Sequence, residues 1–150
     1  MPKRRRRINV VLDTNIFVRN FLTSSRGSPN RRVIRLWLVE RKFKLALSSE
    51  IESEYLRIFE ELLGFDRDTL IAWKRRFANK RITQTVGVGS SSLSRDPTDN
   101  VFIATATSAK AKFLVTNDRD LLDISEAQKR TLRFKIVTPT RFLQLLESLD

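Results

Sequence analysis

The sequence predicts an α/β fold in which helices cover both faces of a parallel sheet. Short apolar, β-branched runs alternate with stretches of helical periodicity, and this alternation is typical of βαβ units. The 150 residues include only 4 Gly and 4 Pro, so most of the chain is expected in regular elements. A hydrophobic share of 41% supports a substantial core, and the length suits one domain.

Four segments have the pattern of buried strands, and two of them lead into an acidic residue. The run Ile-Asn-Val-Val-Leu ends at Asp13, and the run Lys-Phe-Leu-Val-Thr is followed by Asn117 and Asp118. Ligands of parallel sheets bind beyond the carboxyl ends of the strands, so both acids are expected at the functional edge. Each acid has an alternative role as the cap of a turn or helix. The strands are predicted at residues 8–12, 43–47, 112–116 and 134–137.

Start and stop signals place helices between these strands. Ser48 and Ser49 offer an N-cap to a helix that Gly64 ends. Asp96 and Pro97 form a second helix start. The helices are predicted at residues 28–40, 49–63, 66–79, 98–109 and from Pro139 onward, with a loop rich in Gly and Ser at 86–95.

A net charge of +12 points to an anionic partner, of which nucleic acid is the commonest. Residues 3–7 carry +5 and leave +7 elsewhere, so we divide the chain into a basic tail, residues 1–7, and one folded domain, residues 8–150. A purely solubilising tail is the alternative interpretation. A second basic cluster, on the helix predicted at 66–79, is a candidate for contact with nucleic acid: Lys74, Arg75 and Arg76.

The chain contains neither cysteine nor histidine, which excludes several kinds of active site. It has no disulfide, no thiolate nucleophile and no cysteine zinc site. It also has no Ser-His-Asp triad and no histidine metal ligand. Hydrolytic chemistry would therefore depend on carboxylates, Lys, Tyr, hydroxyls or a bound metal. No apolar run reaches the length of a membrane span, and we expect a cytoplasmic protein.

Two further acids on predicted helices are candidate site residues. Asp99 lies three residues after Asp96, where an acid also supports the cap and the helix dipole. Glu54 borders the apolar stripe of its helix, and Glu52 also lies near apolar positions, so helical geometry alone leaves both open. The stripe is predicted at Ile51, Tyr55, Ile58 and Leu62.

Several acids that converge on one site would repel each other strongly. Two carboxylates about 4 Å apart repel by about 4 kcal/mol at an effective dielectric of about 20. Such a group binds either protons or a divalent cation. Oxygen ligands alone favour Mg²⁺ or Mn²⁺ over zinc, and a metal held in this way can activate water and clamp a phosphodiester.

The order of these motifs resembles the PIN-domain family, and within it the VapC-like toxins of toxin–antitoxin pairs. Val-Leu-Asp-Thr-Asn resembles the opening strand and first acid, Asp13. Ser-Ser-Glu-Ile-Glu-Ser-Glu-Tyr resembles the second motif and favours Glu54 over Glu52. Residues 96–106 and 114–121 resemble the third and fourth motifs. The polybasic start and the long basic helix depart from the family pattern.

The resemblance implies a three-layer α/β/α sandwich with a central parallel sheet and cleavage of single-stranded RNA with a divalent metal. It also implies a small antitoxin partner and frequent homodimers. Trp73 and Phe77 are candidates for a dimer face, with core packing as their alternative. The implied catalytic and metal-binding residues are Asp13, Glu54, Asp99 and Asp118. The supporting positions are Thr14, Asn15, Asp96, Thr116, Asn117 and Asp120.

Three other functions compete with the nuclease. A phosphatase with an aspartyl nucleophile requires a second acid where Asn15 stands, and a receiver domain requires paired acids where only Asp13 is present. A non-catalytic PIN-fold module that binds nucleic acid fits the basic charge equally well. Acids that face a phosphate backbone nevertheless repel it unless a metal bridges them, which favours the enzyme.

Deleting residues 3–7 is predicted to weaken binding of single-stranded RNA without abolishing it. Each neutralised phosphate contributes about −0.7 to the slope of log affinity against log salt, and the rest of the chain keeps +7. RNA affinity measured at several salt concentrations for the full and truncated chains tests this. Complete loss of affinity on truncation would assign binding to the tail alone.

Overall fold

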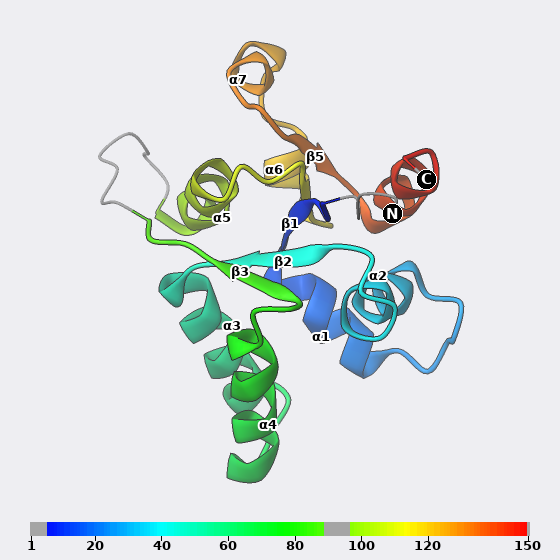
Figure 1. Cartoon of the computed structure of the whole chain (residues 1–150), viewed down its shortest axis with the longest axis vertical. Coiled ribbons are helices and arrows are strands. Elements are labelled where there is room, and N and C mark those ends of the chain that lie inside the picture. The colour runs from blue at the N-terminus through cyan, green and yellow to red at the C-terminus, as the bar shows by residue number, and fades with distance from the viewer. Residues whose placement is uncertain (1–5, 89–96, 150) are drawn as a thin grey trace, which may run out of the picture.

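Five parallel strands form one sheet at the centre of the fold (Figure 1). Their order is β3-β2-β1-β4-β5, so β1 is central and pairs with β4, which comes about 100 residues later in the chain. The computed structural model describes residues 6–88 and 97–149, without the side chains of residues 97–100. The strands are β1 (Asn9–Leu12), β2 (Lys44–Leu47), β3 (Thr83–Thr85), β4 (Phe113–Val115) and β5 (Lys135–Val137).

Helices cover both faces of this sheet, which confirms the predicted three-layer α/β/α architecture. Helices α1, α2, α3 and α4 lie on one side, α5 and α6 lie on the other, and α7 projects beyond β5 (Figure 1). The C-terminal helix α8 packs against α2. The helices are α1 (Thr14–Leu22), α2 (Pro29–Leu38), α3 (Ser49–Glu61), α4 (Arg67–Ala78), α5 (Pro97–Ser108), α6 (Arg119–Leu122), α7 (Glu126–Arg130) and α8 (Pro139–Glu147).

The four predicted strands and five predicted helices are present with small shifts at their ends. Gly64 has φ +67, a left-handed conformation that glycine adopts without strain, and it follows α3 as predicted. The structure adds β3 and the helices α1, α6 and α7. Strand β3 lies at the edge of the sheet and has the sequence Thr-Gln-Thr. Because it contains no apolar run, hydrophobic periodicity did not predict it.

An aromatic cluster joins the helices on one side of the sheet. The ring of Phe17, fully buried on α1, has five aromatic neighbours with centroids 4.7–6.0 Å away. These neighbours come from α2, α3 and α4, and they are Trp37, Tyr55, Phe59, Trp73 and Phe77. Core packing is therefore the role of Trp73 and Phe77, and neither is available for a dimer face.

The apolar stripe predicted for α3 was partly wrong. The buried residues of this helix are Ile51, Tyr55 and Phe59. Ile58 is half-buried, and Leu62, just beyond the helix, is 63% exposed. The pattern allowed both choices, because Phe59 is adjacent to Ile58 and the position of α4 decides which of them is covered.

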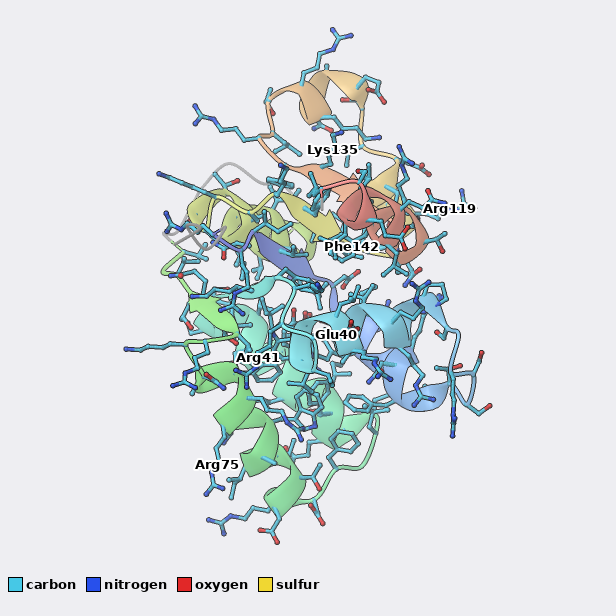
Figure 2. All side chains as sticks on the ribbon, turned by 45° about the vertical axis from the view of Figure 1, so that its right-hand side comes forward. Glu40, Arg41, Arg75, Arg119, Lys135 and Phe142 are labelled. Carbon is cyan, nitrogen blue, oxygen red and sulfur yellow. The ribbon has the colours of Figure 1, made fainter. Side chains whose placement is uncertain are left out.

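Part of the basic N-terminal segment is attached to the domain. The guanidinium of Arg7 donates hydrogen bonds to the backbone carbonyls of Arg41 and Arg81. Arg41, labelled in Figure 2, lies in the turn before β2. In the described part of the chain, no helix has the length and apolarity needed to cross a membrane.

Phe17→Ala is expected to destabilise the protein by about 3–5 kcal/mol, because it leaves a cavity beneath five aromatic rings. Leu22→Ala is the matched control on the same helix, since Leu22 is 69% exposed, and it should change the free energy of unfolding by less than about 0.5 kcal/mol. Urea unfolding of the three proteins measures both values. Equal losses in the two variants would contradict the assignment of Phe17 to the centre of the core.

Candidate active site

The ends of β1 and β4 meet where the sheet changes its direction of winding. From β1 the chain continues to β2 on one side, whereas from β4 it continues to β5 on the other. Leu12 is in register with Val115, and the backbone N–H of Asp13 donates to the Val115 carbonyl at 2.9 Å. Asp13 therefore lies at a topological switch point, where open α/β sheets bind their ligands.

A single buried hydroxyl connects the two strand ends. Thr116 Oγ1 donates to Asp13 Oδ2 at 2.6 Å and accepts from the backbone N–H of Asp118 at 2.9 Å. Thr116 is fully buried, so water does not compete for these bonds. The hydroxyl thus fixes the carboxylate of Asp13 relative to the backbone that carries Asp118.

Helix α3 is tied to the end of β1 through two consecutive residues. Thr14 Oγ1 donates to Glu54 Oε2 at 2.6 Å. The buried hydroxyl of Tyr55 donates to the Leu12 carbonyl. At the start of the same helix, the hydroxyl of Ser48 caps the N–H of Ile51, as predicted. These contacts hold Glu54 beside Asp13.

Asp13, Glu54 and Asp118 line one cavity of about 230 Å³. Apolar side chains from α1, α3, α5 and α6 complete its wall, and they include Val18, Ile58, Phe102 and Leu121. Asn15 also lines the cavity. None of the ion pairs in the described part of the chain includes any of the three acids. The cavity thus places partly desolvated carboxylates together without compensating protein cations.

Burial raises the pKa of Asp13 above its usual value of 3.8. The Thr116 hydroxyl lowers this pKa, and the negative charges of Asp118 and Glu54 raise it. Burial also raises the pKa of Tyr55 well above 10.0, and the charges of Asp13 and Glu54 add to the effect. Tyr55 therefore stays protonated and acts as a donor.

The structure separates the alternatives that the sequence left open for Asp13 and Asp118. Asp13 precedes α1, but its side chain makes no capping hydrogen bond, so it is free of the predicted structural role. Asp118 does cap α6, because one of its oxygens accepts from the N–H of Asp120 at 2.9 Å, and it lines the cavity as well. Capping and site formation are compatible at Asp118.

Glu52 and the predicted supporting residues take different positions. Burial raises the pKa of Glu52, although the nearby positive charge of Lys74 opposes the rise, and Glu52 does not line the cavity. Asn117 Nδ2 donates to Asn30 Oδ1 of α2 at 3.1 Å, so it holds α2. Asp120 is exposed at the start of α6.

Asp99, the fourth predicted acid, belongs to α5, but its side chain lies outside the described part of the structure. Asp96 also lies outside the described residues. In the described part, no three or more Asp and Glu side chains are close enough, as placed, to ligate one ion. The described residues therefore bring three acids to one cavity but do not by themselves form a group that ligates a metal.

Tyr55 is the residue whose role at the site the sequence did not predict. Its place in the apolar stripe of α3 indicated core packing alone. A signal was present, however, because a buried tyrosine hydroxyl needs a hydrogen-bond partner. Which carbonyl it reaches depends on the position of α3 against β1.

Comparison with known proteins gives the family of this chain and a structure of similar fold. Residues 9–120 match the family described as PIN domain. A chain in the crystal structure of VapBC2 from Rickettsia felis, bound to a DNA fragment from their promoter, has a similar fold with a TM-score of 0.52 and 15% sequence identity. The similarity covers 87% of this chain and 98% of that chain. No curated protein sequence matches significantly.

Asp13→Asn is expected to raise the melting temperature in metal-free buffer at neutral pH, because it removes a charge that burial disfavours. The Thr116 hydroxyl can donate to the amide oxygen as it does to the carboxylate. Because the folded pKa lies above 3.8, the penalty is absent below the unfolded pKa and grows as pH rises through the folded pKa.

Melting curves from about pH 3.5 to about pH 7.5 measure this difference, with the exposed Glu60→Gln as the control for loss of one charge. The gap between Asp13→Asn and the parent protein should be smallest at the acidic end. A variant that melts several degrees lower at neutral pH would mean that Asp13 is a structural residue.

Proposed function

This chain belongs to the PIN-domain family, and on that premise we propose that it is a metal-dependent endoribonuclease that cleaves single-stranded RNA. The observation that carries the proposal is the cavity at the β1–β4 switch point. It is lined by three carboxylates, and Asp13, the most buried of them, is 8% exposed and has no ion-pair partner in the described residues. Such a site is stabilised by a bound cation.

The donor chemistry of the cavity fits Mg²⁺ or Mn²⁺. The polar side chains that line the cavity are carboxylates, a hydroxyl and an amide, and each can bind a cation through an oxygen atom. The chain has no His or Cys that could add a nitrogen or sulfur ligand. The residues that would hold the ion are Asp13, Glu54, Asp118 and, from α5, Asp99. When bound, the ion supplies an activated water and positive charge for the scissile phosphodiester.

The chain's own side chains prepare this site. Thr116 and Thr14 each donate to one carboxylate, so Asp13 and Glu54 are oriented before any ligand arrives. Tyr55 fixes the helix that carries Glu54. The apolar wall limits the water that reaches the carboxylates, which strengthens their attraction for a cation.

We further propose that the protein is the toxin of a toxin–antitoxin pair. Support comes from the motif resemblance and from the shared fold with a chain of the VapBC2 complex. A small antitoxin is then the expected protein partner, and a homodimer the expected oligomer. An operon without an adjacent small gene, together with a monomer in light scattering, would count against this part of the proposal.

The alternative function is a PIN-fold module that binds nucleic acid without cleaving it. Its basic surface would serve equally well, but its cavity would hold acids that repel phosphate. The two functions differ in one measurement, which is cleavage of single-stranded RNA with Mg²⁺ or Mn²⁺ and its loss in EDTA.

Asp13→Asn and Glu54→Gln are each expected to lower cleavage by orders of magnitude, because each removes a charged metal ligand. RNA affinity measured in EDTA should be unchanged or slightly higher, since a charge facing the phosphates is gone. The matched control is Glu52→Gln, on the same helix as Glu54 but beside Lys74, and it should retain cleavage.

Melting temperatures of all three variants are measured alongside cleavage, so that unfolding is not mistaken for lost chemistry. Full cleavage by Asp13→Asn would remove this residue from the mechanism and leave the non-catalytic module as the better function. Equal loss in Glu52→Gln and Glu54→Gln would contradict the choice of Glu54.

A further inference from the structure

The excess positive charge of the folded domain is concentrated in one part of the chain. Residues 14–44, from α1 to the start of β2, hold eight Lys or Arg residues and one acid, Glu40, a net charge of +7. Residues 49–81, from α3 to the end of the loop after α4, hold seven basic and seven acidic residues and are neutral. The basic cluster that the sequence suggested on α4 therefore lies in a balanced region.

Contacts on α4 support this view of its charges. The guanidinium of Arg76 stacks 4.5 Å from the ring centroid of Trp73. Lys74 lines a hollow together with Glu60 and Asp66, and its charge also acts on Glu52. Arg75 projects from the outside of α4 (Figure 2). The cations of α4 therefore lie among the acids of the neighbouring α3 and of the α4 N-terminus, which offset their charge.

A groove between α1 and α2 has the opposite character. It has a volume of about 370 Å³, and in the described part of the chain its wall contains no acidic residue. Arg35 is bridged to Glu40 at a long 3.9 Å, and its side chain is 71% exposed, so this pair leaves the guanidinium accessible. The cations of the groove are Arg26, Arg31, Arg32 and Arg35.

The groove and the acidic cavity are linked by α1, which lines both, and by α2, which is hydrogen-bonded next to Asp118. Asn15 and Val18 of α1 line the cavity, and Asn20 of the same helix lines the groove. From Asn15 to Asn20 an α-helix rises about 7.5 Å and turns by about 140°, so the groove and the cavity lie on different faces of α1, a short distance apart along it. On α2, Asn30 is hydrogen-bonded to Asn117, next to Asp118, and Arg31 follows directly.

We propose that the groove between α1 and α2 is the phosphate-binding track that leads single-stranded RNA to the acidic cavity. The inference rests on the proposed function and adds the surface that holds the substrate. Guanidinium groups bind phosphate through paired hydrogen bonds, and four of them along one groove suit a repeating backbone. Among the described residues, no aromatic side chain lines the groove for bases to stack on, so binding should be largely independent of sequence.

The test compares two double variants that remove the same charge from different surfaces. Arg26→Gln with Arg32→Gln neutralises the groove at two exposed positions, and Arg67→Gln with Arg75→Gln neutralises α4. The probe is a fluorescein-labelled single-stranded RNA dodecamer, and its anisotropy is measured in EDTA at several salt concentrations. Melting temperatures check that both variants fold.

The groove variant should reduce the salt slope by about 1.4, because two phosphate contacts are lost. Its affinity at about 0.15 M salt should fall on the order of tenfold, whereas the α4 variant should lose less than about twofold. Equal losses of RNA affinity in the two variants would mean that only the net charge of the protein matters, and the proposal would be wrong. Unchanged affinity in the groove variant would also overturn it.

Two further outcomes have distinct meanings. If the groove variant keeps RNA affinity but loses binding to a peptide of alternating Glu and Leu, the groove is a site for an acidic protein segment and the proposal is wrong. If RNA binds in the groove with the expected slope but is not cleaved with Mg²⁺ or Mn²⁺, the track stands and the nuclease function fails. If the parent protein cleaves RNA and the groove variant binds and cleaves it equally well, the nuclease function stands and the proposed track is wrong.

Discussion

The hydrogen bonds of the Thr116 hydroxyl are the interaction on which the site depends. They join the carboxylate at the end of β1 to the backbone at the end of β4, two segments about 100 residues apart in the chain. A bond of this kind is strong where water is excluded, and Thr116 is fully buried. It fixes Asp13 in an environment that disfavours its charge, which is the basis of the cation site that we propose for the cavity.

The rest of the fold serves to bring a helix to this pair of strands. The aromatic cluster around Phe17 packs α1, α3 and α4 together on one face. Because Tyr55 belongs both to this cluster and to the hydrogen bond with Leu12, core packing and site geometry are coupled through one side chain. Glu54 is adjacent to it and reaches the cavity as a consequence.

Opposite charges are kept apart on neighbouring surfaces of one small domain. Acids line the cavity, whereas arginines of α2 and of the loop before it line a groove on another side of α1. Mixed together, these groups would pair and neutralise one another. In the proposed function, the separated groups act on the same polyanion, with the arginines on its backbone and the acids, through a cation, on the bond to be broken.

The sequence by itself determined the α/β class, the acids at the two strand ends and the stop at Gly64, because these features depend on local periodicity and backbone conformation. It did not determine that Asp13 leaves α1 uncapped while Asp118 caps α6, since both fit the same local pattern. The sequence did not predict strand β3, because Thr-Gln-Thr has no apolar pattern and forms a strand only through its pairing with β2. Only the tertiary structure decided the arginine groove and the position of Glu54, because both depend on how α1 packs against its neighbours. Side-chain contacts between distant segments produce no periodic pattern in the sequence.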